Sequence, residues 1–163
     1  MARAHVYKRD HINTDEIIPA RYLNTDDMAE LTTHCMEDLD TDFVKKCQQG
    51  DIIVGGDDFG CGSSREHAVW AIQGAKVGTV IAQSFARIFY RNCINLGLPL
   101  LVCPGVTKFV VEGNELKINL EKGIVENISG EEKCHGEQIS DYAFHILEAG
   151  GIKPLLRAQQ STG

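Results

Sequence analysis

The residues best suited to chemistry in this 163-residue chain lie in one glycine-rich segment, Phe59 to His67. Unpaired backbone N–H groups in such a loop, together with the positive end of a following helix, attract an anion. Gly62 keeps the backbone open, and Ser63 and Ser64 add hydroxyl groups. Arg65 adds a planar guanidinium that pairs bidentately with a carboxylate or a phosphate. The segment therefore predicts an anion site, although Ser-Ser-Arg-Glu alone is also typical of a serine helix cap beside a solvated arginine.

Standard glycine-loop motifs do not fit this segment. A phosphate-binding P-loop needs a lysine after its last glycine, and none stands there. The dinucleotide fingerprint needs a third glycine at the position of Arg65, and a nucleophile elbow needs Gly-x-Ser-x-Gly. Nucleotide cofactors and acyl-serine chemistry are therefore disfavoured, and a small polycarboxylate is the ligand that the residues favour.

The elements that position the loop are a short buried strand before it and a helix after it. Residues 51–55 form the expected strand. Ala68, Ala71 and Ile72 recur at helical spacing, and Gly74 is placed to end that helix. Upstream, 4–7 is an expected strand and 9–23 an expected long ordered loop. Two short helices should follow, the first with Met28, Leu31 and Cys35 on one face and the second over 43–48.

Downstream, two more buried strands are expected at 77–82 and 98–102, separated by a helix over 85–96 that Ser84 caps. The helix should turn four side chains inward: Phe85, Ile88, Phe89 and Cys93. Strands that alternate with helices imply right-handed crossovers and a parallel sheet. Alternating residues at 116–120 and 124–128 predict a small antiparallel meander. Ser140 should cap a helix over 141–149, Pro154 should open a last helix, and 159–163 should fray.

The fold class predicted is α/β: one domain over residues 1–163, with a central, mostly parallel sheet flanked by helices and a small antiparallel C-terminal meander. The net charge of −7 argues against a nucleic-acid binder. No apolar run reaches membrane-spanning length and no signal peptide is evident, so we expect a cytoplasmic protein. The six cysteines lack zinc or iron–sulfur ligand spacing. They are expected to be core residues or free thiols, and only Cys61, in the glycine loop, attracts attention.

Three segments of the chain resemble the small subunits of 3-isopropylmalate dehydratase, which are swivelling domains of the aconitase superfamily. The segments are Asn13-Thr14-Asp15-Glu16-Ile17-Ile18-Pro19-Ala20-Arg21-Tyr22-Leu23, Phe59-Gly60-Cys61-Gly62-Ser63-Ser64-Arg65-Glu66-His67-Ala68 and Ser84-Phe85-Ala86-Arg87-Ile88-Phe89-Tyr90-Arg91-Asn92. Their order and spacing match the family, and the resemblance covers roughly residues 4–104.

This resemblance implies a hydro-lyase subunit that is inactive alone. The family dehydrates a 2-hydroxy-dicarboxylate and rehydrates the alkene with the hydroxyl moved, which converts 2-isopropylmalate to 3-isopropylmalate in leucine biosynthesis. A [4Fe-4S] cluster acts as the Lewis acid, and its cysteine ligands belong to a separate large subunit. In the family, the counterpart of Ser63 removes the carbon-bound proton, and Ser64 and Arg65 occupy substrate-carboxylate positions. A loop formed by Tyr22, Leu23, Asn24 and Thr25 reaches the variable group of the substrate.

Other residues carry weaker expectations. Asp15 either orders the central loop, pairs with a cation near the site, or serves a plain turn or cap. Arg21 is expected to support the site. His67 is expected to be packed and hydrogen-bonded. Arg87 and Arg91 lie one helical turn apart. One alternative places them facing the substrate cleft, and the favoured one is structural or subunit-interface pairing.

Several alternatives stay open at this stage. The enzyme alternatives are small subunits acting on homoaconitate, citraconate-type malates or dimethylmalate. A non-catalytic anion-binding module and an RNA-binding offshoot belong to other classes, and the acidic charge counts against the last. The sequence does not show whether isolated chains associate with themselves.

Overall fold

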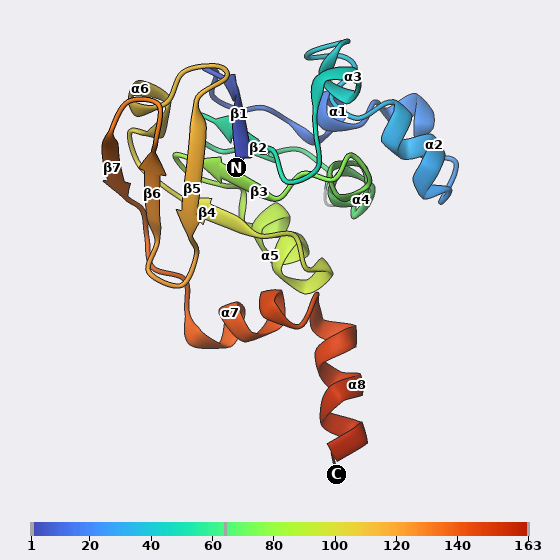
Figure 1. Ribbon diagram of the computed structural model, residues 1–163. Coiled ribbons are helices and arrows are strands. Elements are labelled where there is room, and N and C mark those ends of the chain that lie inside the picture. Colours follow the sequence, from blue (N-terminus) through green and yellow to red (C-terminus); the bar gives the residue numbers. More distant parts are fainter. Residues whose placement is uncertain (1, 64, 163) are drawn as a thin grey trace.

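A seven-stranded sheet flanked by helices makes up the computed structural model, which describes residues 2–63 and 65–162 (Figure 1). The strands follow the order β4-β3-β2-β1-β5-β6-β7 across the sheet. Their bounds are β1 Ala2–Tyr7, β2 Ile52–Gly55, β3 Thr79–Ala82, β4 Leu100–Val102, β5 Glu115–Asn119, β6 Ile124–Asn127 and β7 Glu132–His135.

The helices are mostly short and connect or follow the strands. Figure 1 shows α8 extending away from the body of the protein. No helix among the described residues is both long and apolar enough to cross a membrane. The helical bounds are α1 Thr14–Ile17, the 3-10 turn η1 Ala20–Tyr22, α2 Met28–Thr33, α3 Phe43–Lys46, α4 His67–Gly74, α5 Arg87–Leu96, α6 Val106–Phe109, α7 Asp141–Glu148 and α8 Ile152–Thr162.

Two halves of the sheet differ in strand direction. Strands β1 to β4 are parallel, and β5 to β7 form the antiparallel meander. Strand β1 belongs to both halves, because it pairs with β2 in parallel and with β5 antiparallel through Ala2 and Arg3. The predicted fold class is confirmed, and the meander is a continuation of the main sheet.

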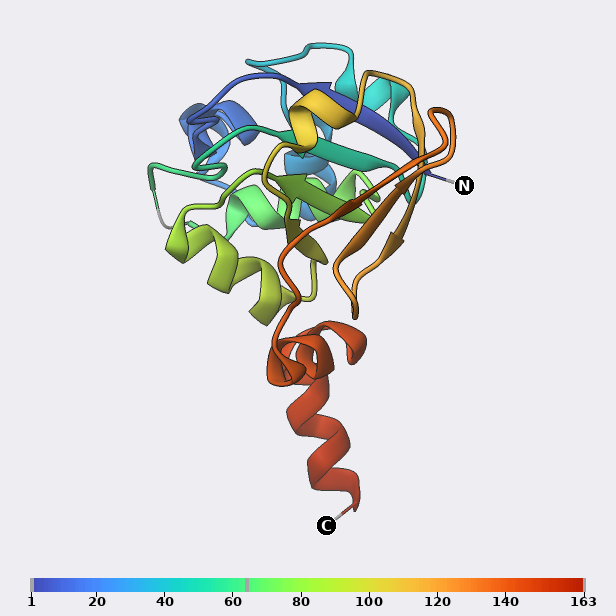
Figure 2. The same cartoon turned by 90° about the vertical axis from the view of Figure 1, so that its left-hand side faces the viewer.

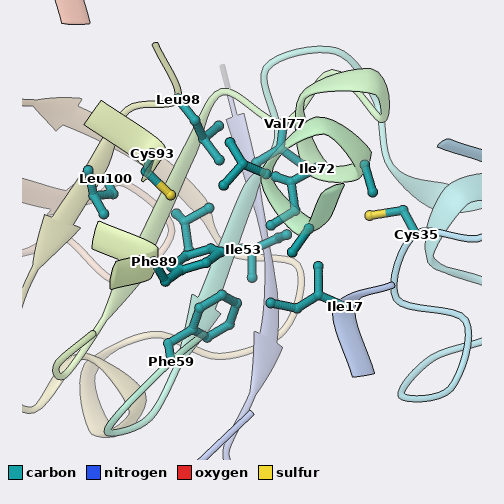
Figure 3. Packing of buried hydrophobic residues seen from close by; sticks show 14 of the residues in the cluster. Ile17, Cys35, Ile53, Phe59, Ile72, Val77, Phe89, Cys93, Leu98 and Leu100 are labelled. Carbon is teal, nitrogen blue, oxygen red and sulfur yellow. The ribbon is translucent and has the colours of Figure 1, made fainter. Parts of the chain in front are cut away.

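Both faces of the parallel half are buried, which explains the nearly continuous apolar strands in the sequence. Successive side chains of a strand point to opposite faces. Ile53 therefore joins the core beneath the helices, while Ile52 and Val54 join a second core with the meander. Figure 3 shows the first core, in which Phe59 and Phe89 lie close to Ile53.

The sheet curls so that its two outermost strands approach each other. The backbone N–H of Glu137, just after β7, donates to the carbonyl of Val102 in β4 at 2.7 Å. Beside this bond, the sulfur atoms of Cys103 and Cys134 lie 3.0 Å apart. Figure 2 shows the chain leaving the meander and crossing toward α7. We call this contact between β4 and the β7 end, formed by residues 102–103 and 134–137, the seam.

Three local expectations for the first hundred residues are wrong. The loop over 9–23 contains α1 and η1, because Asn13 and Glu16 form a capping box that stabilises one helical turn. Helix α5 begins at Arg87, two residues later than expected, and Ser84 does not cap it. The side chains of Ile88 and Met28 point outward, with 51% and 41% of their surface exposed.

The C-terminal third also departs from expectation in part. Ser140 caps α7 as predicted, accepting a hydrogen bond from the Ala143 N–H. Strand β7 and helix α6 were not predicted, since β7 is mostly polar and α6 has no capping side chain. Helix α8 begins at Ile152, before Pro154, and continues to Thr162 through most of the range that was expected to fray.

Candidate active site

The candidate site forms where the loops after the carboxyl ends of β1, β2 and β3 meet. In parallel sheets these ends share one edge, where ligands commonly bind. Residues 11–14, after β1, run alongside residues 57–61, after β2. Backbone hydrogen bonds of 2.8 Å join them, from His11 N–H to the Asp57 carbonyl, from Gly60 N–H to the Ile12 carbonyl and from Thr14 N–H to the Cys61 carbonyl. The glycine loop is therefore fixed by backbone, although its tip is exposed.

Ser63 is exposed at that tip and is held by Thr14. The N–H of Ser63 donates to Oγ1 of Thr14 at 3.1 Å, and the two hydroxyl oxygens lie 3.2 Å apart. Thr14 itself is only 3% exposed and begins α1. It was not among the predicted site residues. Its place in the Asn13-Thr14-Asp15 segment was the one signal that pointed to it.

Glycine is required at two positions of this loop. Gly60 and Gly62 adopt φ values of +85° and +101°, which side chains rarely tolerate. A Cβ atom at Gly60 would also collide with the ring and Cβ of Phe89. The rings of Phe59 and Phe89, with centroids 5.6 Å apart, pack directly beneath. The loop is thus seated on the aromatic core.

The loop after β3 supports the glycine loop from the other side. Ser84 Oγ accepts a 2.8 Å hydrogen bond from the Asp58 N–H and donates to Asp57 Oδ1 at 3.1 Å. Asp58 also contacts Nδ1 of His11 at 3.0 Å. Asp57 and Asp58 thus connect the glycine loop to Ser84 and His11. Ser84 links two loops instead of capping a helix.

Helix α4 begins at His67, four residues after Ser63, with Glu66 at its N-cap and no side-chain capping bond. The hydroxyl of Ser63 pairs with Thr14, so the serine-cap alternative does not describe it. Gly62 and Arg65 are exposed beside it, and Ser64 lies outside the described residues. The described part of the predicted anion site is therefore an open surface.

The loop over residues 22–26 reaches the start of α4. His67 Nε2 lies 3.2 Å from Asp26 Oδ1, and its ring packs on Trp70, which confirms the expected hydrogen-bonded histidine. The loop is anchored by Tyr22, which stacks on His34 with ring centroids 3.6 Å apart. Asn24 is exposed, while Leu23 and Thr25 are half-buried. The structure thus brings the predicted specificity loop toward the glycine loop.

The remaining candidates divide between the site and other surfaces. Asp15 is exposed in the first turn of α1, next to Thr14. Arg21 faces α2 and its following turn, with bonds to Glu37 at 3.3 Å and Asp38 at 2.9 Å. Arg87 begins α5, directly after the bridge between Phe59 and Phe85. Arg91 instead lines a hollow between α5 and α7, away from the glycine loop, together with Tyr90, Ile94, Asn95, Tyr142, Ala143 and Ile146.

Charge pairing fixes the base of the site. Glu16 pairs with Arg9, and this hydrogen bond lowers the pKa of the carboxyl group below its usual value. Glu16 also accepts a hydrogen bond from the Asn13 N–H, which completes the capping box of α1. The same carboxylate therefore holds the start of α1 and, through Arg9, the segment that follows β1. Burial raises the pKa of the Cys61 thiol, so this cysteine is not an activated nucleophile.

The cysteines of this chain do not fit an iron–sulfur cluster, which takes three or four thiolates. Within the described residues, two groups of side chains have potential ligand atoms within 4.8 Å of one another: His5 with Cys47 and Asp51, and His11 with Asp58 and Cys61. Each offers a single sulfur. The cysteines of this chain therefore do not form the ligand set of a cluster.

The candidate site combines a glycine loop with a serine at the carboxyl edge of a parallel sheet. Comparison of the chain with known protein families identifies the class of protein to which it belongs. The family model described as the aconitase C-terminal domain matches residues 5–104, and the chain belongs to that family. The resemblance drawn from the three sequence segments is thereby confirmed.

Individual relatives narrow the comparison from the whole family to named small subunits. The chain is 52% identical over 159 residues to the "3-isopropylmalate dehydratase small subunit" of Deinococcus deserti, covering 98% of this chain and 88% of the relative. It is 49% identical over 152 residues to the "Isopropylmalate/citramalate isomerase small subunit" of Methanocaldococcus jannaschii, covering 93% and 90%. A crystal structure of 3-isopropylmalate dehydratase from M. jannaschii superposes with a TM-score of 0.93 at 41% identity, covering 99% of this chain and 95% of that one.

Proposed function

We propose that this chain is the small subunit of a hydro-lyase that interconverts 2-isopropylmalate and 3-isopropylmalate in leucine biosynthesis. The observation that carries the proposal is the exposed Ser63, held by the buried Thr14 in a chain of the aconitase C-terminal domain family. Relatives about half identical over nearly the whole chain bear the name of that small subunit. The alternatives of a binding module or an RNA-binding protein are not favoured.

In this function Ser63 Oγ removes the proton from the carbon next to the departing hydroxyl. Serine is a weak base, so its anionic form needs stabilisation. The hydroxyl of Thr14, 3.2 Å away, supplies it by donating a hydrogen bond to Ser63 Oγ. A hydrogen bond to the charged form lowers the pKa of an acid. Thr14 is therefore a positioning and stabilising residue for the base.

Arg65 is exposed, and its guanidinium pairs with a substrate carboxylate through its planar fork. Ser64 is expected to bind the same substrate. The loop at Tyr22, Leu23, Asn24 and Thr25 meets the variable group. Because Asn24 carries no charge, an apolar isopropyl substituent suits it better than a third carboxylate, which is costly to bury without a cation.

A larger partner completes the enzyme. The names of the relatives imply a large subunit, and the aconitase superfamily implies an iron–sulfur cluster. Dehydration needs a dry site, whereas Ser63 and Arg65 are exposed on this chain. The large subunit covers this surface and holds the [4Fe-4S] cluster, which supplies Lewis-acid chemistry when bound. The assembled enzyme works in the cytoplasm on a small dicarboxylate.

Reconstitution tests the proposal. The chain is purified anaerobically with the cluster-bearing large subunit from the same genome, and each subunit is also assayed alone. We expect turnover of isopropylmalate only in the mixture. Citramalate and homocitrate-type tricarboxylates are the comparison substrates. Equal activity of the large subunit without this chain, or no turnover of any malate by a cluster-loaded complex, would contradict the assignment.

A further inference from the structure

Two cysteines at the seam face each other although nothing in the candidate active site uses them. The sulfur atoms of Cys103 and Cys134 lie 3.0 Å apart, and both residues are free thiols. A disulfide bond is about 2.05 Å long, so the sulfurs need to move together by only about 1 Å. We propose that this pair is a modification site, which a peroxide oxidises to an intramolecular Cys103–Cys134 disulfide.

The other cysteines are not arranged in this way. In the described part of the chain, the pair at the seam is the only one whose two sulfur atoms are in contact. Cys35 and Cys93 are buried singly in the core beneath the helices. The thiol of Cys47 donates to the carbonyl oxygens of Gln48 and Ala75. The pairing at the seam is therefore specific to two of the six cysteines.

Exposure sets the order of the oxidation steps. Cys134 lies in the outermost strand β7 and is partly exposed, whereas Cys103 is fully buried. Burial and the neighbouring Cys134 raise the pKa of Cys103 to about 12, so Cys103 stays a thiol at neutral pH. A peroxide therefore reaches Cys134 first.

The chemistry balances with one equivalent of hydrogen peroxide. Its O–O bond breaks as Cys134 becomes a sulfenic acid, and one water leaves. The Cys103 thiol then loses its proton as its sulfur attacks the sulfur of Cys134. The S–S bond forms, the S–O bond of the sulfenic acid breaks, and the hydroxyl leaves with that proton as a second water. Two thiol hydrogens are lost in total, and the two sulfurs give two electrons to the peroxide. A thiol reductant reverses the reaction.

The bond would connect the two edges of the sheet. Cys103 follows β4 and Cys134 belongs to β7, so 31 positions of chain, including α6, β5 and β6, would be closed into a loop. Closing a loop of this length restricts the unfolded chain and stabilises the fold. The seam otherwise has the single backbone bond from Glu137 to Val102. For a chain of this size, a rise in Tm of about 5–10 °C is expected.

The test oxidises the full-length chain with a graded series of hydrogen peroxide. Remaining thiols are alkylated under denaturing conditions, and cross-linked peptides are mapped by mass spectrometry. We expect two of six thiols to disappear, a Cys103–Cys134 cross-linked peptide to appear, and Tm to rise. Dithiothreitol should return all three readouts to their starting values.

Three alanine variants separate this outcome from others. Cys103→Ala and Cys134→Ala should each abolish the cross-link and the rise in Tm, while the matched control Cys47→Ala should keep both. If Cys103→Ala, which is buried, fails to fold, the half-exposed Cys134→Ala carries the test alone. A sulfinic acid on Cys134 without a cross-link, a disulfide to Cys61, or dimers joined through Cys134 would overturn the proposal. None of these outcomes depends on the enzyme activity proposed above.

Discussion

The parallel and antiparallel halves of this sheet are stabilised alike but are used differently. Both bury apolar residues on a shared core, as Ile52 and Val54 of β2 do with Leu116 and Val125 of the meander. Only the parallel half directs loops from several strands to one edge, where Thr14, Ser63 and Ser84 meet. The meander joins its strands by short turns and contributes no residue to the candidate site. The parallel half therefore brings the candidate site residues together, whereas the antiparallel half contributes side chains to the core.

The largest expected difference between the halves is in catalysis. Ser63→Ala should lower kcat of the assembled enzyme by about 10²–10⁴-fold, the usual effect of losing a positioned proton-transfer group. Ser129→Ala, in the meander, is the matched control and should leave kcat unchanged, because Ser129 only accepts the Glu115 N–H. Steady-state kinetics of both complexes give the comparison. Near-normal kcat in Ser63→Ala would place the base elsewhere.

Two glycines, one in each half of the molecule, allow the effect of a substitution on the free energy of unfolding to be compared. Gly60→Ala should lower the free energy of unfolding by about 2–4 kcal/mol, since it combines an unfavourable φ with a collision against Phe89. Gly113→Ala, before β5, has a similar φ of +84° and open space around it. It should lose only about 1 kcal/mol from backbone strain. Urea denaturation measures both, and equal losses would mean that the glycine loop is not tightly seated on the aromatic core.

Thr14 tests whether the exposed base depends on a buried neighbour. Thr14→Val keeps the shape of the side chain and removes the hydroxyl, so kcat should fall roughly tenfold with little change in KM. Thr14→Ser keeps the hydroxyl and should retain most of the activity. In the valine variant alone, the low-pH limb of the kcat–pH profile, which reports protonation of the base, should move to higher pH. An unchanged profile with a proportional loss of folded protein would indicate a purely structural role.

The smallest expected effect concerns the specificity loop. Asn24→Arg should raise the ratio of kcat/KM for a homocitrate-type tricarboxylate over isopropylmalate several-fold, because the new cation pairs with the added carboxylate. The wild type should favour isopropylmalate. Asn24→Gln, which adds length without charge, is the control. A wild-type preference for the tricarboxylate, unaffected by Asn24→Arg, would show that this loop does not set specificity.

Sequence patterns predicted the parallel half well because its strands are apolar runs separated by amphipathic helices. The predictions were less accurate where one residue type suits two different structural roles. Ser84 has the residue type and position of a helix cap, yet its hydroxyl bonds Asp57 and Asp58 across the loop. Ile88 has the spacing of a core residue, yet it is exposed on α5. Tertiary contacts decided these cases, and local pattern carries no information about them.

The candidate site shows the same division. Ser63, Ser64 and Arg65 were predicted as one group from residue type, and the specificity loop from resemblance. The role of Thr14 depends on a contact between residues 49 positions apart, which spacing alone does not reveal. Strand β7 was missed because its residues, Glu132 to His135, are mostly polar and exposed and show no apolar alternation. Helix α6 was missed because it begins after Gly105, without a capping side chain.

The place of β1 in the sheet has a consequence for synthesis of the chain. This strand is made first, yet it lies between β2 and β5, and β5 is complete only at Asn119. At about 5–20 residues per second, the ribosome leaves one edge of β1 unpaired for on the order of ten seconds. An unpaired strand edge invites pairing with other chains. Nascent chains of this subunit therefore pass through a period in which one edge of β1 is open to pairing with other chains.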